Sequence, residues 1–169
     1  MTIKEIQFVP DPILRKVALP VEKITNATKQ LLDDMAETMY HAPGIGLAGP
    51  QIGELQRLIV MDCSRDDETD ELWQMINPVI IQSSGESSIL EEGCLSIPGH
   101  SSEVTRPDWV ELKFTDKNGK QQEIRAEGLL AACIQHEIDH LNGILFIDHI
   151  SKLKRDMIWR KVLKEVRQT

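Results

Sequence analysis

An apolar run that ends in ionisable side chains, LLAACIQHEIDH (residues 129–140), restricts the fold more than any other segment of the chain. Asn142-Gly143, a pair typical of helix ends, follows it, so the pattern predicts a helix over residues 128–141. Because apolar residues precede the first histidine, a position on a solvated surface is disfavoured. We therefore expect this helix at the centre of the fold.

The rest of the chain mixes helices with strands that are joined by hairpins. Alternating residues around Asn118-Gly119, in WVELKFTDKNGKQQEIRAEG, predict a β-hairpin. The segments LQRLIVM (55–61) and WQMINPVII (73–81) are typical of buried strands, and the charged loop DCSRDDETDE separates them. This order is not that of repeated βαβ units, so it indicates an α+β fold with antiparallel sheets packed around the central helix.

Two more helices complete the predicted fold. The first is capped by Thr25 or Asn26, carries apolar residues at helical spacing, and stops at Pro43-Gly44 before a glycine-rich turn. The last begins near Ser151, a typical N-cap residue. With 169 residues and no internal repeat or linker, residues 1–169 are expected to form a single domain.

Composition excludes several classes of protein. Hydrophobic residues make up 41% and charged residues 27%, which is ordinary globular usage and disfavours disorder. No stretch reaches the ~20 apolar residues of a membrane span, and the N-terminus has no apolar signal core. We therefore expect a cytoplasmic protein, or a mature form already trimmed, with no membrane partner. The net charge of -8 makes DNA a poor partner as well.

The motif H-E-x-x-H occupies the end of the predicted central helix. His136 and His140 are four residues apart, so both imidazoles point to the same side and can bind one metal ion. Glu137 lies beside them, within reach of a metal-bound water. The motif is short enough to occur by chance, but its apolar setting favours a metal site.

A catalytic metal ion usually takes three protein ligands, so a third must lie elsewhere. Phe146 stands where extended metalloprotease motifs have a histidine, and Glu165 is surrounded by basic residues. Cys94, in EEGCLSIPG, is the better candidate, because it lies in an extended segment that can reach a helix. Of the other two cysteines, Cys63 opens a charged loop and Cys133 is expected to line a pocket. Their odd number argues for reduced thiols.

Three segments in this order and spacing resemble the peptide deformylases: GIGLAGPQ (44–51), EEGCLS (91–96) and QHEIDH (135–140). Enzymes of this family remove the formyl group from the N-terminal methionine of new bacterial and organellar proteins. The similarity extends over most of the chain, from ILRKVA near its start. It implies one divalent metal ion bound by Cys94, His136 and His140.

The resemblance also implies the other roles in the reaction. Glu137 takes a proton from water that the ion has made acidic, and passes it to the departing amine. Gln51 and the backbone N–H of Leu95 stabilise the oxygen of the formyl group. The products are formate and a free N-terminal methionine.

The substrate, an N-formylmethionyl nascent peptide, is expected to lie as an added strand beside the glycine-rich segment. Gly46 offers main-chain hydrogen bonds, and Gly44 and Gly46 permit a backbone that other residues resist and allow the peptide to approach closely. The methionine side chain needs an apolar slot, although plain core packing explains each single residue nearly as well. The candidates for this slot are Ile45, Leu90, Leu129, Ala132 and Cys133.

Family membership implies Fe²⁺ as the usual ion, with Zn²⁺, Ni²⁺ or Co²⁺ as substitutes, because one thiolate and two imidazoles suit all four. Iron beside a thiolate is sensitive to oxygen. The chain departs from the family pattern at Pro43 and Gly49, and it lacks a basic residue soon after Pro98. These departures affect the specificity beyond methionine and the subclass.

The segment Lys152–Arg167 carries seven basic and two acidic residues, a net charge of +5 in an otherwise acidic chain. One interpretation is a docked helix with a solvated basic face, and the other is contact with ribosomal RNA near the exit of the nascent chain. Two functions compete with deformylation. A general metallopeptidase needs no cysteine ligand, and a metal-binding interaction module does not need Glu137.

Overall fold

The computed structural model describes residues 2–64 and 69–168. Within these ranges the chain forms helices and two antiparallel sheets. In chain order the elements are η1 (Pro12–Arg15), α1 (Asn26–His41), β1 (Gly46–Ala48), η2 (Gly49–Ile52), β2 (Leu58–Met61), β3 (Trp73–Ser83), β4 (Ser87–Cys94), β5 (Ile97–Pro107), β6 (Trp109–Thr115), β7 (Gln121–Glu127), α2 (Gly128–Leu141), η3 (Phe146–His149) and α3 (Lys152–Arg167), where η marks a 3₁₀-helix.

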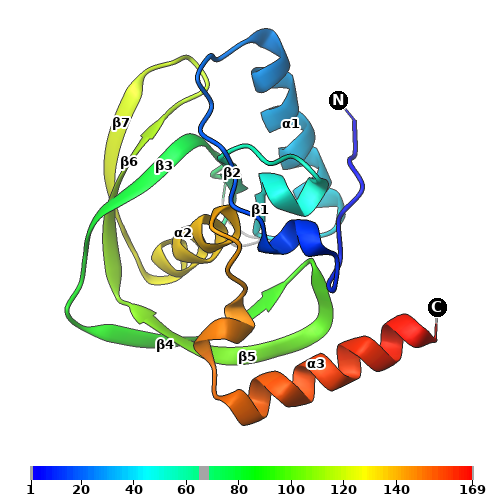
Figure 1. The fold of residues 1–169 in the computed structure, drawn as a ribbon. Helices are drawn as coiled ribbons and strands as arrows, with labels where there is room; N and C mark the ends of the chain where they lie inside the picture. Colours follow the sequence, from blue (N-terminus) through cyan, green and yellow to red (C-terminus); the bar gives the residue numbers. More distant parts are fainter. Residues whose placement is uncertain (1, 65–68, 169) are drawn as a thin grey trace.

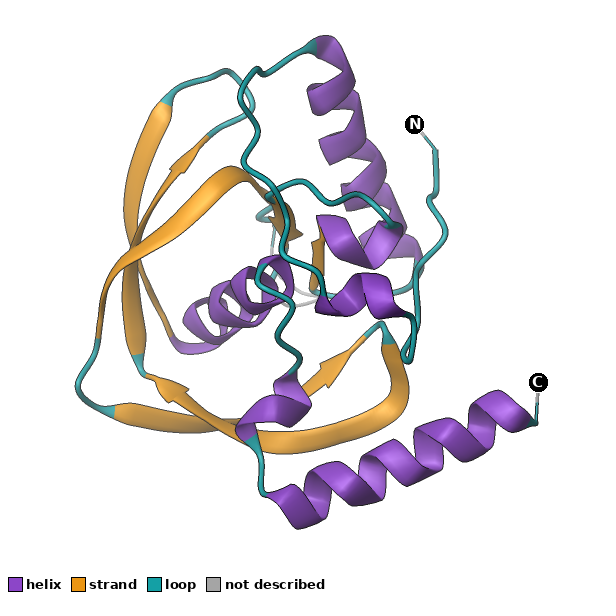
Figure 2. Cartoon of the chain, in the orientation of Figure 1, coloured by secondary structure: helices purple, strands orange, loops and turns teal. Residues whose placement is uncertain are grey.

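The two sheets enclose helix α2. Five strands form the larger sheet in the order β1-β2-β3-β6-β7, and β4 pairs with β5 in a separate hairpin. Figure 1 shows α2 in the middle, with the curved strands β3, β6 and β7 along one side of it and the β4–β5 hairpin below it. Helices and strands are mixed rather than alternating (Figure 2). The predicted α+β fold around a central helix is confirmed.

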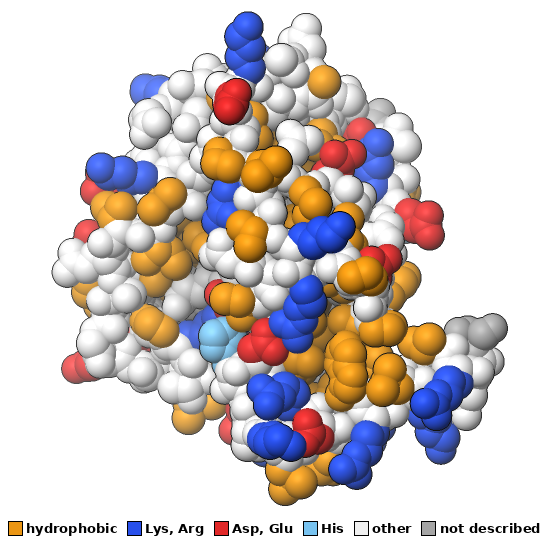
Figure 3. All heavy atoms as spheres, viewed as in Figure 1, with side chains coloured by type: hydrophobic (Ala, Val, Ile, Leu, Met, Phe, Trp, Pro, Cys, Tyr) orange, Lys and Arg blue, Asp and Glu red, His pale blue; other side chains and the backbone are white. Residues whose placement is uncertain are grey.

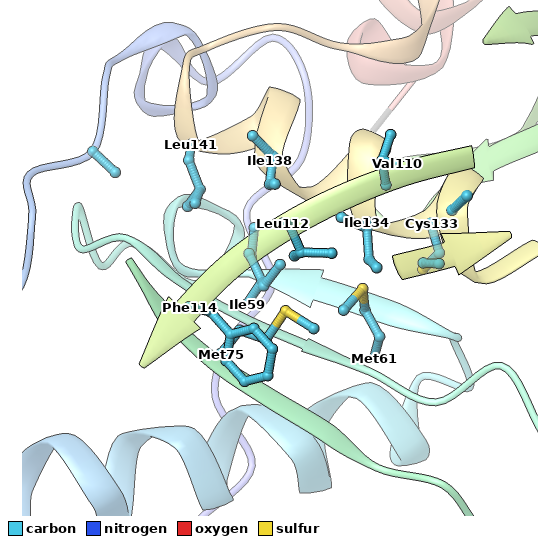
Figure 4. Packing of buried hydrophobic residues seen from close by; sticks show 14 residues of the cluster. Ile59, Met61, Met75, Val110, Leu112, Phe114, Cys133, Ile134, Ile138 and Leu141 are labelled. Carbon is cyan, nitrogen blue, oxygen red and sulfur yellow. The ribbon is translucent and has the colours of Figure 1, made fainter. Parts of the chain in front are cut away.

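Apolar residues of α2 form the centre of the main core. Ile134 and Leu141 have no exposed surface and pack with Ile59 of β2 and Leu112 of β6 (Figure 4). Burying one such side chain stabilises the fold by about 1.5–3 kcal/mol relative to leaving it in water. This burial fixes α2 against the sheet, so the opposite side of the helix can carry the polar residues of the site.

Helix α1 covers the sheet near β1 and β2. Its predicted N-cap is confirmed, because the Thr25 side chain accepts a hydrogen bond from the backbone N–H of Thr28. Leu32, Met35 and Met39 are fully buried against the sheet. The helix therefore holds the strand β1, which borders the site, in place from behind.

Several predicted boundaries agree with the structure and others do not. The hairpin around Asn118-Gly119 is confirmed as β6 and β7. Strand β2 begins at Leu58 rather than at residue 55, because the backbone of residues 55–57 bonds Leu19 in an isolated bridge instead of continuing the pairing of β2 in the sheet. The predicted glycine-rich turn contains the short strand β1. The predicted charged loop includes residues 65–68, which lie outside the described residues.

Helix α3 packs loosely on the outside of the molecule. Ser151 caps it as predicted, and Val162 is its one buried residue within the described chain. Lys and Arg side chains lie along its outer surface, and hydrophobic side chains gather where it meets the body (Figure 3). Among the helices of residues 2–64 and 69–168, none is both long and apolar enough to cross a membrane.

Candidate metal centre

Helix α2 and the end of β4 bring together three potential metal ligands. One ligand atom from each of Cys94, His136 and His140 lies within 4.8 Å of the other two. The Cys94 Sγ is 3.3 Å from the His140 Nε2. Both histidines are buried because one helical turn places them on the enclosed side of α2. The pairing of β4 with β5 is irregular between Gly93 and Cys94, because Cys94 pairs with Ile97 instead of His100, and such an irregularity redirects a side chain.

A buried ion pair fixes the orientation of His136. The His136 Nδ1 lies 2.9 Å from Glu92 Oε1, which leaves Nε2 as its metal-binding atom. Arg106 on β5 donates from Nε and Nη2 to the two oxygens of Glu92, at 2.6 and 2.9 Å. Burial raises the pKa of Glu92, but the hydrogen bonds from Arg106 and His136 outweigh burial and lower this pKa to about 2. The carboxylate therefore stays ionised and holds the imidazole.

The same ion pair extends to the far side of α2. Asp139 accepts a hydrogen bond from Arg106 Nη1 at 2.9 Å and lies 2.8 Å from the Nε2 of His149. Neither Glu92 nor Arg106 was predicted from the sequence. A signal was present, because Glu92 precedes Cys94 by two residues on the same strand and shares its face. Arg106, the partner of Glu92 on β5, has no comparable signal in the sequence around it.

The carboxyl group of Glu137 lies inside the protein beside the three potential ligands. Its side chain is buried, and among the described residues its Oε1 has no hydrogen-bond partner. Burial is the main reason that the pKa of Glu137 is raised to about 7. A carboxyl group with this pKa can accept and release a proton near neutral pH.

Gln51 is held rigidly beside Cys94. Its Oε1 accepts a hydrogen bond from the Ala48 N–H at 2.9 Å, and its Nε2 donates to Ser96 Oγ at 3.1 Å. The same Nε2 is 3.5 Å from Cys94 Sγ. The short helix η2 therefore directs the amide nitrogen of Gln51 towards the ligand cluster. Leu95, the residue after Cys94, lines the same cavity.

A cleft of about 770 Å³ opens onto these side chains. Every residue predicted to form the methionine slot lines it, as do Gly46, Gln51 and Glu137. The members of the predicted slot are Ile45, Leu90, Leu129, Ala132 and Cys133. The N-terminal segment contributes Ile6 and Phe8, and strand β5 contributes Pro98 and His100, and none of these four was predicted from the sequence.

The conformational reason expected for the two glycines beside the cleft is wrong. Neither Gly44 nor Gly46 has a positive φ, so neither needs the conformational freedom of glycine. Glycine is needed at both positions because there is no space for a side chain. A Cβ on Gly46 would lie 2.4 Å from Glu137 Oε2, and a Cβ on Gly44 would lie 2.7 Å from the Leu95 side chain.

The donor set fits a divalent metal ion. Burial lowers the pKa of His140 well below its usual value, so this imidazole is neutral, as metal binding requires. Burial acts in the same direction on His136, but the negative charges of Glu137 and Glu92 and the Cys94 thiol raise its pKa well above the usual range. The centre thus favours positive charge, which a metal ion supplies. One sulfur and two imidazole nitrogens suit zinc, iron, nickel or cobalt.

A sequence profile of polypeptide deformylases matches residues 3–156, which include every residue of the cluster and the cleft. The chain belongs to the polypeptide deformylase family. It is 56% identical to a peptide deformylase of Mesorhizobium japonicum, over 97% of this chain and 93% of that protein. The identity to a peptide deformylase of Rhizobium meliloti is 55%, with 97% and 94% covered.

Solved structures of deformylases share the whole fold. The crystal structure of a peptide deformylase from Legionella pneumophila is 48% identical, with a TM-score of 0.90 and coverage of 99% of this chain and 97% of that one. A peptide deformylase from Ehrlichia chaffeensis in complex with actinonin is 41% identical, with a TM-score of 0.92 and 98% of each chain covered. The protein is thus a metal-dependent hydrolase that removes the N-formyl group from the N-terminal methionine of newly synthesised polypeptides.

Proposed function

We propose that Cys94, His136 and His140 bind the catalytic metal ion of this deformylase and that Glu137 transfers the protons of the reaction. One observation carries the proposal: three ligand atoms lie within 4.8 Å of one another beside a buried carboxylate oxygen that has no partner among the described residues. Structural metal sites usually use four protein ligands. Three ligands leave a position for water and substrate.

The physiological ion is Fe²⁺ in this proposal, with Zn²⁺, Ni²⁺ or Co²⁺ as substitutes. A bound divalent ion supplies Lewis-acid chemistry, because it makes water a nucleophile near neutral pH and polarises a carbonyl oxygen. The Cys94 thiol is half-buried at the cleft, so oxygen can reach it. We expect an iron-loaded sample to lose activity in air, since thiolate and ferrous iron both oxidise.

The peptide substrate lies along β1, the edge strand of the larger sheet. Strand β1 pairs with β2 on one side, and its first residue Gly46, with the preceding Ile45, borders the cleft. An extended peptide can therefore add to this edge through main-chain hydrogen bonds. The methionine side chain then enters the apolar slot beside Leu129 and Cys133.

The protein groups act in a fixed order during hydrolysis. Gln51 Nε2 and the Leu95 N–H donate hydrogen bonds to the formyl oxygen and stabilise the negative charge that it gains when water adds to the carbon. Glu137 accepts a proton from that water. It then delivers the proton to the methionine nitrogen as the C–N bond breaks. Formate leaves, and the amine of methionine is free.

The test measures formate release from a short formyl-methionyl peptide by metal-loaded protein prepared without oxygen. Glu137→Gln keeps the size of the side chain, and it is expected to lower kcat by about 10²–10⁴-fold, the usual contribution of a general acid–base group. Glu123→Gln, an exposed carboxylate on β7 outside the lining of the cleft, is the matched control and should retain full activity.

Metal analysis separates the proposed role of Glu137 from loss of the ion. The Glu137→Gln protein should keep its metal, whereas Cys94→Ser should lose affinity for it. Full activity of metal-loaded Glu137→Gln would exclude the proton-transfer role. Retention of activity and metal by Cys94→Ser, with cleavage of internal peptide bonds, would instead favour a general metallopeptidase.

We further propose that the protein acts in the cytoplasm and contacts ribosomal RNA through α3. The basic side chains of α3 are largely exposed, including Lys161, Lys164 and Arg167, and Val162 alone is buried among its described residues. Such a helix can bind phosphates without losing much core packing. Charge reversal of the exposed lysines and arginines should abolish co-sedimentation with ribosomes. Undiminished binding by the folded variant would contradict the contact.

A further inference from the structure

Two cysteines outside the proposed ligand set meet behind the cleft. Cys63 follows β2 and packs against the core cluster that contains Cys133 of α2. Cys133 Sγ and the backbone N–H of Asp62, the residue before Cys63, donate to the same carbonyl oxygen, that of Ile45, and each thiol shifts the pKa of the other. Cys63 is partly exposed, whereas Cys133 is buried and lines the cleft. A solvent-accessible thiol thus contacts a thiol in the wall of the substrate site.

We propose that Cys63 and Cys133 form a reversible disulfide when the protein meets a peroxide, and that this bond weakens substrate binding. The effect on substrate binding rests on the proposed function of the cleft. The disulfide itself does not, because it depends only on the contact between the two thiols.

The reaction with hydrogen peroxide has two balanced steps. The Cys63 sulfur attacks one peroxide oxygen, the O–O bond breaks, and Cys63 becomes a sulfenic acid while water leaves. The Cys133 sulfur then attacks the sulfenic sulfur, the S–O bond breaks, and a second water leaves with the Cys133 proton. Both thiols are oxidised and the peroxide is reduced. The hydrogen bond with Cys133 lowers the pKa of Cys63, which increases its reactive thiolate form.

The position of Cys133 explains why a disulfide with Cys63 would affect substrate binding. Its Sγ donates to the carbonyl oxygen of Ile45 at 3.7 Å, and the backbone N–H of Asp62 donates to the same oxygen at 2.9 Å. A Cβ on Gly46 would lie 2.9 Å from this Sγ. The thiol therefore supports the backbone of the segment along which the substrate is proposed to lie.

Disulfide formation removes that support. The bond takes the proton that Cys133 donates to Ile45 and draws its sulfur to about 2.05 Å from that of Cys63. Residues Ile45 and Gly46 then lose a contact, and the wall of the methionine slot moves. We expect KM to rise by about tenfold, the lower end of the effect of a lost methylene contact in an apolar pocket.

The experiment uses zinc-loaded protein, because zinc does not take part in redox chemistry. The sample is treated with hydrogen peroxide, and its metal content, intact mass and non-reduced peptide map are measured. A mass loss of two hydrogen atoms and a linked peptide with Cys63 and Cys133 are the expected results. A reducing dithiol should restore both the mass and the KM.

Cys63→Ala is the variant that isolates the pair, since it removes the exposed thiol and leaves the cleft wall intact. Its KM should stay unchanged after peroxide treatment. A linked peptide that contains Cys94 in place of Cys63, or an equal rise of KM in Cys63→Ala, would overturn the proposal and assign the oxidation to the metal centre. A linked pair with unchanged KM would overturn the effect on substrate binding alone.

Discussion

The buried carboxylate of Glu92 depends on a single guanidinium group. Arg106 is 5% exposed and satisfies both oxygens of Glu92, so removing it leaves a negative charge inside the protein. We expect Arg106→Leu to lower the free energy of unfolding by about 3–5 kcal/mol, the usual effect of breaking a buried ion pair. Urea unfolding followed by circular dichroism measures the change.

Two further variants test whether the uncompensated charge is the cause. Lys113→Leu, at an exposed position of β6, should change stability by no more than about 0.5 kcal/mol. The double variant Arg106→Leu with Glu92→Leu should recover part of the loss, because no buried charge remains. A double variant as unstable as the sum of the single ones would contradict this explanation.

At Gly46 there is no room for even one additional carbon atom beside Glu137. A methyl group on this residue would lie 2.4 Å from Glu137 Oε2, so Gly46→Ala should displace the carboxylate. A misplacement of about 1 Å can lower kcat/KM about 100-fold. Formate release measures the loss, and Gly85→Ala is the control because nothing lies within 4 Å of the added atom. Equal activities of the two variants would show that Glu137 moves aside without consequence.

At the scale of elements, Asp62 joins the end of β2 to helix α1. Its Oδ2 accepts a hydrogen bond from the Tyr40 hydroxyl at 2.5 Å, and its Oδ1 accepts one from the Ser64 N–H at 3.0 Å. Burial raises the pKa of Asp62, but the bonds from Ser64 and Tyr40 outweigh burial and hold this pKa below its usual value. The ionised form is therefore favoured by folding.

The sign of the pH dependence follows from this lowered pKa. The stability that Asp62 contributes is complete above the pKa of about 3.9 in the unfolded chain, and it is lost as the pH falls through the lower pKa of the folded state. We expect Asp62→Asn to lower stability by about 1.5–3 kcal/mol at neutral pH, as for other hydrogen bonds to charged groups. The difference from the parent should shrink below about pH 3.9.

Unfolding in urea at several pH values measures this difference. Glu123→Gln, an exposed carboxylate on β7, is the control and should show a small and constant effect. If the difference between Asp62→Asn and the parent grew as the pH fell, the ionised form would not be the one that folding favours.

Local patterns predicted most elements because each carries its own signal. The cap at Thr25, the turn at Asn118-Gly119 and the stop at Asn142-Gly143 depend on residues within a few positions of one another. The strand β1 carries no such signal. It has three residues, and its extended form depends on pairing with β2, which is a tertiary contact.

The same distinction applies to the site. His136 and His140 were predicted from their spacing on one helix, and Cys94 from its segment and from the resemblance to a family. Arg106 was missed, because nothing near it in the sequence shows that β5 carries it to Glu92. Its role depends on how the β4–β5 hairpin lies against α2, and this packing is decided by the whole molecule.

At the scale of the whole molecule, the ligand cluster joins two parts of the fold. Cys94 ends β4 in the small sheet, and the two histidines belong to α2, which packs on the large sheet. Hydrogen bonds and ion pairs also join that hairpin to α2, between Glu92 and His136 and between Arg106 and Asp139, and the cluster adds to them. A bound metal ion would therefore stabilise the native arrangement of both sheets.

Removal of the metal ion should lower the thermal stability. A ligand that binds only the folded state stabilises it by about 4 kcal/mol when its free concentration is a thousand times its Kd. For a chain of this size, that corresponds to a rise in Tm of about 8–16 °C. Differential scanning calorimetry of chelator-treated protein, before and after zinc is added back, measures the rise. The rise in Tm should be absent in Cys94→Ser. It should be retained in Cys63→Ser, since Cys63 is equally half-buried but lies outside the cluster. The same rise in both variants would mean that the ion binds elsewhere and does not join the two sheets.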